Sequence, residues 1–231
     1  GLPGETGHAD GTGSAALFEE PSGVALDSAG NIYVTDTGNL TIRKITPAMA
    51  VTTFAGTWGS WGFKDGPPGV AQFNVPVGLA SDPAGNLYVA DWQNSTIRKV
   101  SPAGVVTTLG GQPTGPDGSA DGTGQGAQFN RPYGVAVDSL GRLYVADTFN
   151  DRVSEGIPVP VFTGSTTNEG GVTWTLDGLL GGVTVVAETS TNLHDWWAVQ
   201  TNIAGSFPSQ VQVSRPLHPA PAEEFLRAFY H

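Results

Sequence analysis

One stretch of sequence recurs three times in the first two thirds of the chain, and this repetition constrains the fold more than any other feature. Phe18, Phe73 and Phe129 lie 55 and 56 residues apart. The same steps relate many further positions, among them Asp10, Asp65 and Asp121; Gly23, Gly78 and Gly134; Tyr33, Tyr88 and Tyr144; and Asp36, Asp91 and Asp147. A match this long, with a single one-residue slip, identifies three copies of one structural unit.

Each copy has the pattern of four short β-strands. In the first copy, the β-forming runs are Gly23–Asp27, Ile32–Thr35, Thr41–Ile45 and Val51–Ala55. Asp27 and Gly30 predict the first turn, because Asp accepts hydrogen bonds from nearby backbone N–H groups and Gly readily adopts positive φ. Four antiparallel strands per repeat are typical of a β-propeller blade, which protects its strand edges by packing radially against its neighbours.

The repeated residues PxGVAxDxxGNxYVxDxxNxxIRK resemble the NHL repeat, which is found in six-bladed propellers. The copies at 21–44 and 76–99 fit this pattern well, whereas the third fits only through Asn150. Ser154 then stands where the first two copies have Arg43 and Arg98, and no fourth strand is predicted after it. The resemblance covers about residues 1–156 and implies the fold rather than an activity.

Three blades are half of a six-bladed ring, so the repeats predict an open edge as well as a propeller. Exposed blade edges favour association with other strands. We expect a homo-oligomer or a fragment of a larger propeller, with strands supplied by the tail as a third way to cover the edge. The chain begins at Gly1 without an initiator Met or a signal peptide, which we interpret as a mature or trimmed product.

The period stops near residue 157, and residues 157–231 predict a separate small β domain. The segment Ile157–Pro160 is a Pro-rich linker. Beyond it, the sequences VVAETSTNLHDWWAVQTN and EEFLRAFYH resemble a small β module that ends many secreted bacterial proteins. That resemblance implies an extracellular or periplasmic location. The alternative is a β appendage that only caps the open edge of the propeller.

Composition narrows the classes of partner. Ten basic and twenty-one acidic residues give a formal net charge of −11, which disfavours nucleic acid and anionic membrane surfaces as partners. A negative field suits cations, above all calcium. The chain has no cysteine, which excludes disulfides and thiolate chemistry. No apolar run approaches the roughly eighteen residues needed to span a membrane.

A repeated Asp–x–x–Asn pattern supplies the candidate metal ligands. The residues are Asp36, Asp91, Asp147, Asn39, Asn94 and Asn150. Their oxygens are calcium-type ligands if they converge at one face of the propeller. The alternative is that each Asp–Asn pair shapes a turn, which every blade needs. The threefold repetition favours the turn, because a catalytic site seldom requires one copy per blade.

We interpret the remaining repeated charges as structural. Asp27, Asp82 and Asp138 precede a glycine by three residues and predict turns. Asp10–Gly13 and Asp121–Gly124 have the composition of a calcium loop but lack its alternating ligands. Arg43 and Arg98, each followed by a lysine, are expected to be solvated residues near the outer edge of the blade.

Four aromatic residues in predicted loops are the candidate ligand-binding residues: Trp58, Trp61, Trp92 and Phe149. They differ between the copies, unlike the repeated Tyr and Phe, which favours a role in recognition. Packing between blades is the alternative. The expected partner is a protein or a small-molecule ligand, and the leading hypothesis is a secreted binding scaffold that uses calcium as its cofactor, if it has one.

An enzymatic alternative is a calcium-dependent hydrolase of lactones or esters, by analogy with six-bladed propeller lactonases. A Ser-His-Asp hydrolase is disfavoured, because none of the four histidines lies in a repeated strand and no Gly-x-Ser-x-Gly motif is present.

Overall fold

The computed structural model describes residues 1–156, except Pro116 and Leu140, and the backbone of six strands between residues 161 and 230. It divides into two compact units. The first comprises Gly1–Ser139 and Leu143–Gly156, and the second comprises Leu140–Arg142 and Ile157–His231. The described residues form β-strands joined by turns and short 3-10 helices, and they include no α-helix. The predicted all-β fold is therefore confirmed.

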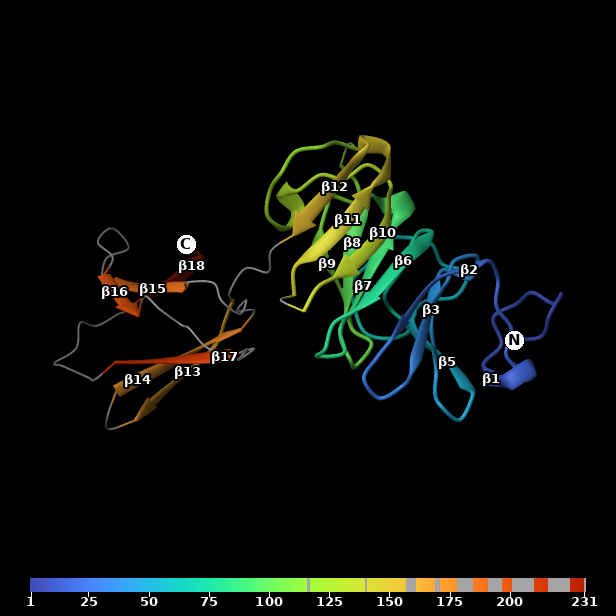
Figure 1. Ribbon diagram of the computed structural model, residues 1–231, viewed down its shortest axis with the longest axis horizontal. Coiled ribbons are helices and arrows are strands. Elements are labelled where there is room, and N and C mark those ends of the chain that lie inside the picture. Colours follow the sequence, from blue (N-terminus) through green and yellow to red (C-terminus); the bar gives the residue numbers. More distant parts are fainter. Residues whose placement is uncertain are drawn as a thin grey trace. The chain divides into compact units, whose positions relative to one another are not determined.

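The first unit contains three antiparallel sheets, one for each sequence repeat (Figure 1). Blade 1 consists of β1 (Gly11–Thr12), β2 (Pro21–Leu26), β3 (Ile32–Asp36), β4 (Thr41–Ile45) and β5 (Ala50–Gly56). Blade 2 consists of β6 (Pro76–Ser81), β7 (Leu87–Asp91), β8 (Thr96–Val100) and β9 (Val106–Gly110). Blade 3 consists of β10 (Pro132–Val137), β11 (Leu143–Asp147) and β12 (Arg152–Gly156).

The strand predictions for the repeats are confirmed, including the absence of a fourth strand in the sheet of blade 3. Blade 1 gains one short strand that the repeat did not predict, because Gly11 and Thr12 of β1 pair with the outer strand β5 at Val51 and Ala50. Blade 2 has the order β6-β7-β8-β9, and the equivalent pairing there is a single isolated bridge between Gly66 and Val106.

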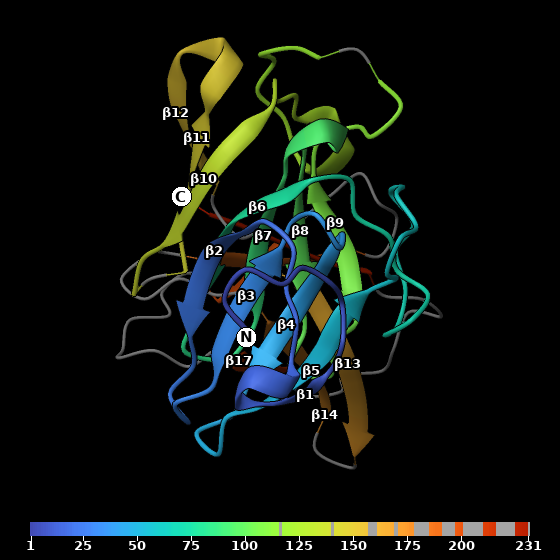
Figure 2. The same ribbon diagram turned by 90° about the vertical axis from the view of Figure 1, so that its right-hand side faces the viewer.

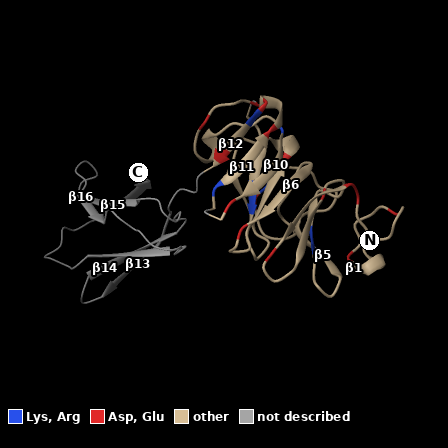
Figure 3. Cartoon of the chain, in the orientation of Figure 1, with Lys and Arg blue, Asp and Glu red and all other residues tan. Residues whose placement is uncertain are grey.

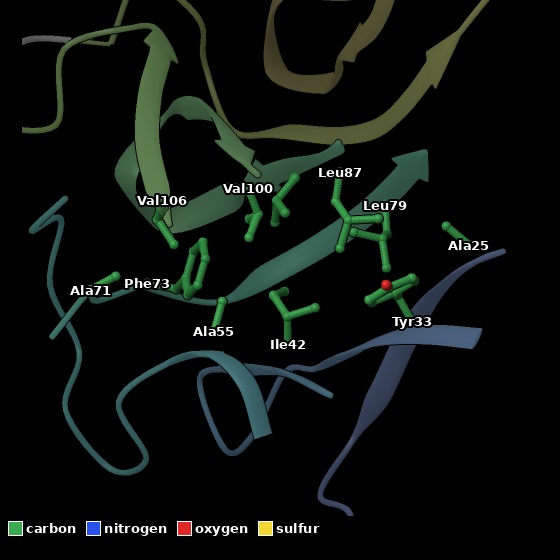
Figure 4. Packing of buried hydrophobic residues seen from close by; sticks show 11 residues of the cluster. Ala25, Tyr33, Ile42, Ala55, Ala71, Phe73, Leu79, Leu87, Val100 and Val106 are labelled. Atoms are coloured by element: carbon green, nitrogen blue, oxygen red, sulfur yellow. The ribbon is translucent and has the colours of Figure 1, made fainter. Parts of the chain in front are cut away.

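The first strands of consecutive blades lie side by side, with β6 between β2 and β10 (Figure 2). Buried side chains fill the space between blades 1 and 2, where Ile42, Tyr33 and Ala55 face Leu79, Leu87 and Phe73 (Figure 4). A second cluster between blades 2 and 3 includes Val77, Tyr88, Ile97, Leu143 and Val145. Successive side chains of a strand point to opposite faces of its sheet. The apolar side chains of blade 2 therefore pack against blade 1 on one face and against blade 3 on the other.

The predicted Asp–Gly turns are confirmed in blades 1 and 2. Asp27 Oδ1 accepts hydrogen bonds from the backbone N–H groups of Ala29 and Asn31, both at 2.9 Å. Gly30 has a φ of 79°, as the turn requires. Asp82 Oδ1 likewise accepts from the backbone N–H of Asn86 at 2.8 Å. The hydrogen bonds with Asn31 lower the pKa of Asp27.

These turns also bind the repeated tyrosines, and this predicts a loss of stability at alkaline pH. Burial, with the hydrogen bond to Asp27, raises the pKa of Tyr33 to about 12. Burial raises the pKa of Tyr88 as well, next to Asp82. An unfolded tyrosine ionises near pH 10. Between pH 10 and pH 12 the unfolded chain therefore loses these protons first, and the free energy of unfolding falls as pH rises.

The measurement is urea denaturation at several alkaline pH values, with phenolate absorbance recorded in parallel. Tyr33→Phe should reduce the fall in stability above pH 10, since it removes one of the two groups responsible. Ionisation of both buried tyrosines near pH 10 in a chain that is still folded would contradict the prediction.

The second unit contains six strands in two antiparallel sheets. One sheet has the order β13-β14-β17, and the other has the order β16-β15-β18. Their bounds are Val161–Asn168 (β13), Gly171–Asp177 (β14), Val185–Ser190 (β15), Trp197–Gln200 (β16), Gln210–Arg215 (β17) and Phe225–Tyr230 (β18). The two tail sequences that resemble the β module, VVAETSTNLHDWWAVQTN and EEFLRAFYH, contain β15, β16 and β18. The predicted linker at 157–160 lies outside the described residues.

Charge is unevenly placed in the first unit. Acidic side chains lie mainly in turns and connections rather than along the strands (Figure 3). In the part of the chain that the structure describes, no helix is long and apolar enough to cross a membrane.

Candidate functional site: the connection face

One end of the blades carries the predicted metal and ligand residues together. In blade 1, strand register places Pro21 opposite Asp36, Asp36 opposite Thr41, and Thr41 opposite Gly56. The turn after β3 and the long connection from β5 to β6 therefore leave from the same end of the sheet. The equivalent turns and connections of blades 2 and 3 do the same. We call this end of the first unit the connection face.

The repeated aspartates lie at this face inside a buried hydrogen-bond network. In blade 2, Asp91 Oδ2 accepts hydrogen bonds from Asn94 Nδ2 at 2.7 Å and from Arg98 Nη1 at 2.8 Å. Its Oδ1 accepts from the backbone N–H of Asn74 at 2.7 Å. Burial raises the pKa of Asp91 to about 6, while the Arg98 guanidinium and the donors at Asn74 and Asn94 oppose that rise.

The network also holds the long connection that precedes each blade. Asn94 Nδ2 donates to the carbonyl oxygen of Gly62 at 2.8 Å. Arg98 donates to the carbonyl oxygen of Gln72 and forms an ion pair with Asp65 at 2.7 Å. The guanidinium also lies over the ring of Phe73, 5.2 Å from its centroid. We call Asp91, Asn94, Arg98 and Asp65, with their equivalents in the other copies, the Asp–Asn–Arg network.

Blade 1 repeats this geometry. Arg43 pairs with Asp36 at 2.7 Å and with Asp10 at 2.8 Å, and Asn39 donates to Asp36 at 2.8 Å. The predicted position of the two arginines was wrong. Arg43 and Arg98 are fully buried rather than solvated, because each guanidinium lies between two carboxylates and backbone carbonyls that neutralise its charge and accept hydrogen bonds from its Nη atoms.

Blade 3 forms the network with a different arginine. Asn150 donates to Asp147 at 2.8 Å, as in the other blades. Arg152, at the start of β12, reaches Asp147 at 3.0 Å and Asp121 at 3.4 Å. Ser154 occupies the place of Arg98, and its buried hydroxyl has no hydrogen-bond partner among the described residues. Since residues two apart on a strand share a face, Arg152 replaces the missing guanidinium from the adjacent position.

For the predicted metal ligands, the structure brings each aspartate together with its asparagine but does not bring the three pairs together. Within the described residues, no three His, Asp or Glu side chains gather in a group suited to a metal ion. A cation at Asp36 or Asp91 would also have to displace the arginine already bound to that carboxylate. The calcium site, and the calcium-dependent hydrolase that relies on it, stay predictions.

The four predicted ligand-binding aromatics all lie at the connection face, in separate groups. Trp58 is half-exposed and stacks on His8, with ring centroids 3.6 Å apart. Trp61 is 72% exposed. Trp92 and Phe149 meet edge to face at 6.4 Å, across the boundary between blades 2 and 3. Among the described residues, no ring contact joins Trp58 or Trp61 to the other pair.

Arg131, which the sequence analysis did not single out, completes the group of Trp92 and Phe149. Its guanidinium carbon lies 4.7 Å from the Trp92 ring centroid and 5.2 Å from that of Phe149. Arg43, Arg98 and Arg152 are all ion-paired, whereas in the described part of the chain no carboxylate pairs with Arg131. We call Trp92, Arg131 and Phe149 the Arg131 cluster.

The backbone fixes where this arginine projects. Arg131 and its equivalents Glu20 and Val75 have φ values of 50°, 48° and 62°. Left-handed φ is costly for non-glycine residues, and most of all for a β-branched one, so three repetitions mark a turn that the fold enforces. The backbone N–H of Arg131 also donates to Ser95 Oγ. The repeated turn therefore offers a fixed position whose side chain differs between copies.

Comparison with known proteins agrees with this fold. The family model described as "NHL repeat" matches residues 18–45, 73–100 and 129–154. The chain is 45% identical over 95 residues to Protein SUPPRESSOR OF QUENCHING 1, chloroplastic, of Arabidopsis thaliana, covering 41% of this chain and 9% of that protein. It is 30% identical over 130 residues to human NHL repeat-containing protein 3, covering 53% and 34%. The chain thus spans about a third or less of these relatives.

A solved structure described as an auxiliary nutrient binding protein from Bacteroides thetaiotaomicron is similar in fold. Its TM-score is 0.51 at 23% sequence identity, and the match covers 57% of this chain and 36% of that one.

Proposed function

Because three NHL repeats form the blades of this chain, we propose that it is a binding scaffold whose ligand surface is the connection face, centred on the Arg131 cluster. The observation that carries the proposal is the guanidinium of Arg131, which lies close to two aromatic rings and has no carboxylate partner among the described residues. A guanidinium close to aromatic rings is attracted by their faces, and its N–H groups can still donate two parallel hydrogen bonds to a ligand.

The ligand that fits this arrangement carries a carboxylate next to an apolar body. A carboxylate matches the paired N–H donors of arginine, and the exposed part of Phe149 offers apolar surface beside it. The Asp–Asn–Arg network holds the surrounding connections in place, so the surface is ordered before the ligand arrives. The nutrient-binding description of the similar Bacteroides structure belongs to that protein, and it accords with a scaffold that binds a ligand.

Binding should depend on Arg131 and on the carboxylate. The probes are peptides with a free C-terminal carboxylate, their amidated counterparts, and acidic and neutral oligosaccharides. We expect Arg131→Ala to weaken binding of the preferred acidic probe about tenfold to a hundredfold, the effect of losing a charge-assisted hydrogen bond. Arg131→Lys should restore part of it, because lysine keeps the charge without the planar pair of donors. Titration calorimetry measures each affinity.

Trp61→Ala is the matched control, since it removes an exposed aromatic of the same face that does not contact Arg131. Equal binding of acidic and neutral probes, unchanged by Arg131→Ala, would overturn the assignment of the ligand class. Loss of binding in Trp61→Ala alone would move the site to the other aromatic group.

We also propose that the protein acts outside the cytoplasm, in the periplasm or the extracellular medium. The resemblance of residues 157–231 to modules that end secreted bacterial proteins supports this location. Fractionation of producing cells tests it, and retention of all the protein in the cytoplasm would contradict it.

A further inference from the structure

Three exposed aromatic side chains lie close together in the connection from blade 1 to blade 2, outside the Arg131 cluster. Trp58, Trp61 and Phe63 fall within six consecutive residues and are 54%, 72% and 48% exposed. A single exposed apolar residue is normal on a protein surface and needs no explanation. Neighbouring exposed aromatic rings, in contrast, indicate a surface that another molecule contacts.

The backbone of this connection does not require the indole rings. The equivalent connection before blade 1 has Thr6 in the place of Trp61. Thr6 and Trp61 nevertheless form the same parallel bridge, to Phe18 and to Phe73 respectively. The turn before each of them is closed by equivalent backbone hydrogen bonds of 3.3 Å and 3.1 Å. Because threonine serves this backbone equally well, the exposed indole of Trp61 is available for recognition.

The second indole is held in a fixed orientation. The ring of Trp58 stacks on that of His8, with centroids 3.6 Å apart and 20° between the ring planes. One face of this indole is therefore covered, and its exposed surface includes the opposite face. The connection itself is fixed by Thr57 Oγ1, which donates to the carbonyl oxygen of Ala71 at 2.9 Å. A ligand that packs on these rings would therefore restrict the protein little further.

Two uncharged polar side chains lie in the same connection. Gln72 Nε2 donates to Ser60 Oγ at 2.6 Å. A Cβ atom at Gly62 would overlap Gln72 Oε1, so the amide oxygen lies beside the backbone that follows Trp61. Among the described residues, no hydrogen bond engages Gln72 Oε1 or the O–H of Ser60 as a donor to another group. One acceptor and one donor are therefore available next to the rings.

The charges around the rings favour a neutral ligand. The stretch Thr57–Phe63 contains no charged residue. The carboxylate that follows it, Asp65, is already paired with Arg98 at 2.7 Å. A cation would be attracted by the indole faces, but this stretch offers it no carboxylate. Lys64 is the one charged residue between Phe63 and Asp65, and it would favour an acidic ligand only if that ligand extended past the rings.

We propose that this connection binds neutral sugar rings on a platform formed by Trp58, Trp61, Ser60 and Gln72, which we call the Trp platform. A pyranose ring presents a face of C–H groups, which packs on the negatively polarised face of an aromatic ring. Its hydroxyl groups lie at the rim of the ring, where the free donor and acceptor of the Trp platform can bond them. The site is separate from the Arg131 cluster, so the inference does not depend on the acidic ligand proposed there.

The test is titration of the 231-residue chain with neutral oligosaccharides of glucose, mannose, galactose or N-acetylglucosamine, followed by tryptophan fluorescence and by calorimetry. We expect one of these series to bind. Trp61→Thr should weaken that binding about tenfold, the scale of one aromatic contact. Its circular dichroism should be unchanged, because it copies the residue of the equivalent connection. Trp58→Ala should have a similar effect on affinity.

Leu109→Thr is the matched control, since it removes an exposed apolar side chain of the same blade, on β9, far in sequence from the platform. Wild-type protein that binds none of the neutral oligosaccharides would overturn the proposal. Equal losses in Trp61→Thr and Leu109→Thr, or a loss in Arg131→Ala with none in Trp61→Thr, would overturn the location. Binding of tetramethylammonium instead of sugars, or a preference for acidic sugars abolished by Lys64→Met, would overturn the ligand class.

Discussion

Replacing Arg98 by methionine should lower the free energy of unfolding by about 3–5 kcal/mol, the loss expected when one partner of a buried ion pair is removed. Asp91 is fully buried, and its ion pair with Arg98 is its only one in the described part of the chain. Methionine fills most of the volume of arginine, so the loss reports the uncompensated carboxylate rather than a cavity. Urea denaturation followed by circular dichroism measures it.

Two further variants identify the cause. Arg98→Met combined with Asp91→Asn should recover part of the lost stability, because the second change removes the buried charge that the first leaves unpaired. Lys99→Met is the control at the neighbouring position of β8, where the side chain is only partly buried and has no ion pair within the described residues. Equal losses in Arg98→Met and Lys99→Met would contradict a specific role for the network.

The same substitution in blade 3 should cost less. Arg152 is 29% exposed and its partner Asp121 is 96% exposed, so water already solvates part of this network, although Asp147 itself is 0% exposed. A loss in Arg152→Met as large as that in Arg98→Met would show that burial of the arginine is not what determines the effect.

The blades could be predicted because their signals are local and repeated. Asp27 and Gly30 specify a turn through residues only a few positions apart, and the alternation around Tyr33 specifies a strand. Each signal occurs three times, so chance matches can be separated from real ones. The shortened third sheet was predictable for the same reason, since the residues that form β5 in blade 1 have no counterpart after Glu155.

The burial of Arg43 and Arg98 could not be predicted in this way. An arginine on a strand is most often solvated, and the carboxylates that compensate it come from a turn and from a distant connection. Asp65 lies 33 residues before Arg98, beyond any local pattern. One signal was present in the sequence: Asp10, Asp36 and Arg43 recur together in two copies. Joint repetition of opposite charges indicates an ion-paired group better than either charge does alone.

The Arg131 cluster was missed for a different reason. Trp92 and Phe149 stand out in the sequence because they are aromatic and because these positions differ between the copies. Arg131 also differs from its equivalents Glu20 and Val75. Its position between the two rings depends on the packing of blade 3 against blade 2, which brings together residues from separate repeats.

Replacing Gly78 by alanine should be among the most damaging single-methyl changes in the chain. The new Cβ atom would overlap the carbonyl oxygen of Tyr133 and approach Gly134 Cα at 3.0 Å. Both atoms belong to the backbone of β10, so relief requires blade 3 to move away from blade 2. We expect a loss of about 3 kcal/mol or more, at or above the usual upper limit for overpacking. Thermal and urea unfolding measure it.

Gly134→Ala adds the same methyl group at the same repeat position and is the matched control. Its Cβ would meet no backbone atom of the described residues within 4 Å, so the free energy of unfolding should fall far less. The comparison separates close packing from the intrinsic cost of replacing glycine on a strand, which is shared by both variants.

If the inner strands of adjacent blades are as close as the structure shows, only Gly78→Ala separates blade 3 from blade 2. It should then expose the apolar cluster around Val77, Ile97 and Val145, detectable as increased hydrogen exchange in β7 and β11. Equal losses for the two variants would mean that the glycines are required for their own conformation rather than for the approach of the next blade.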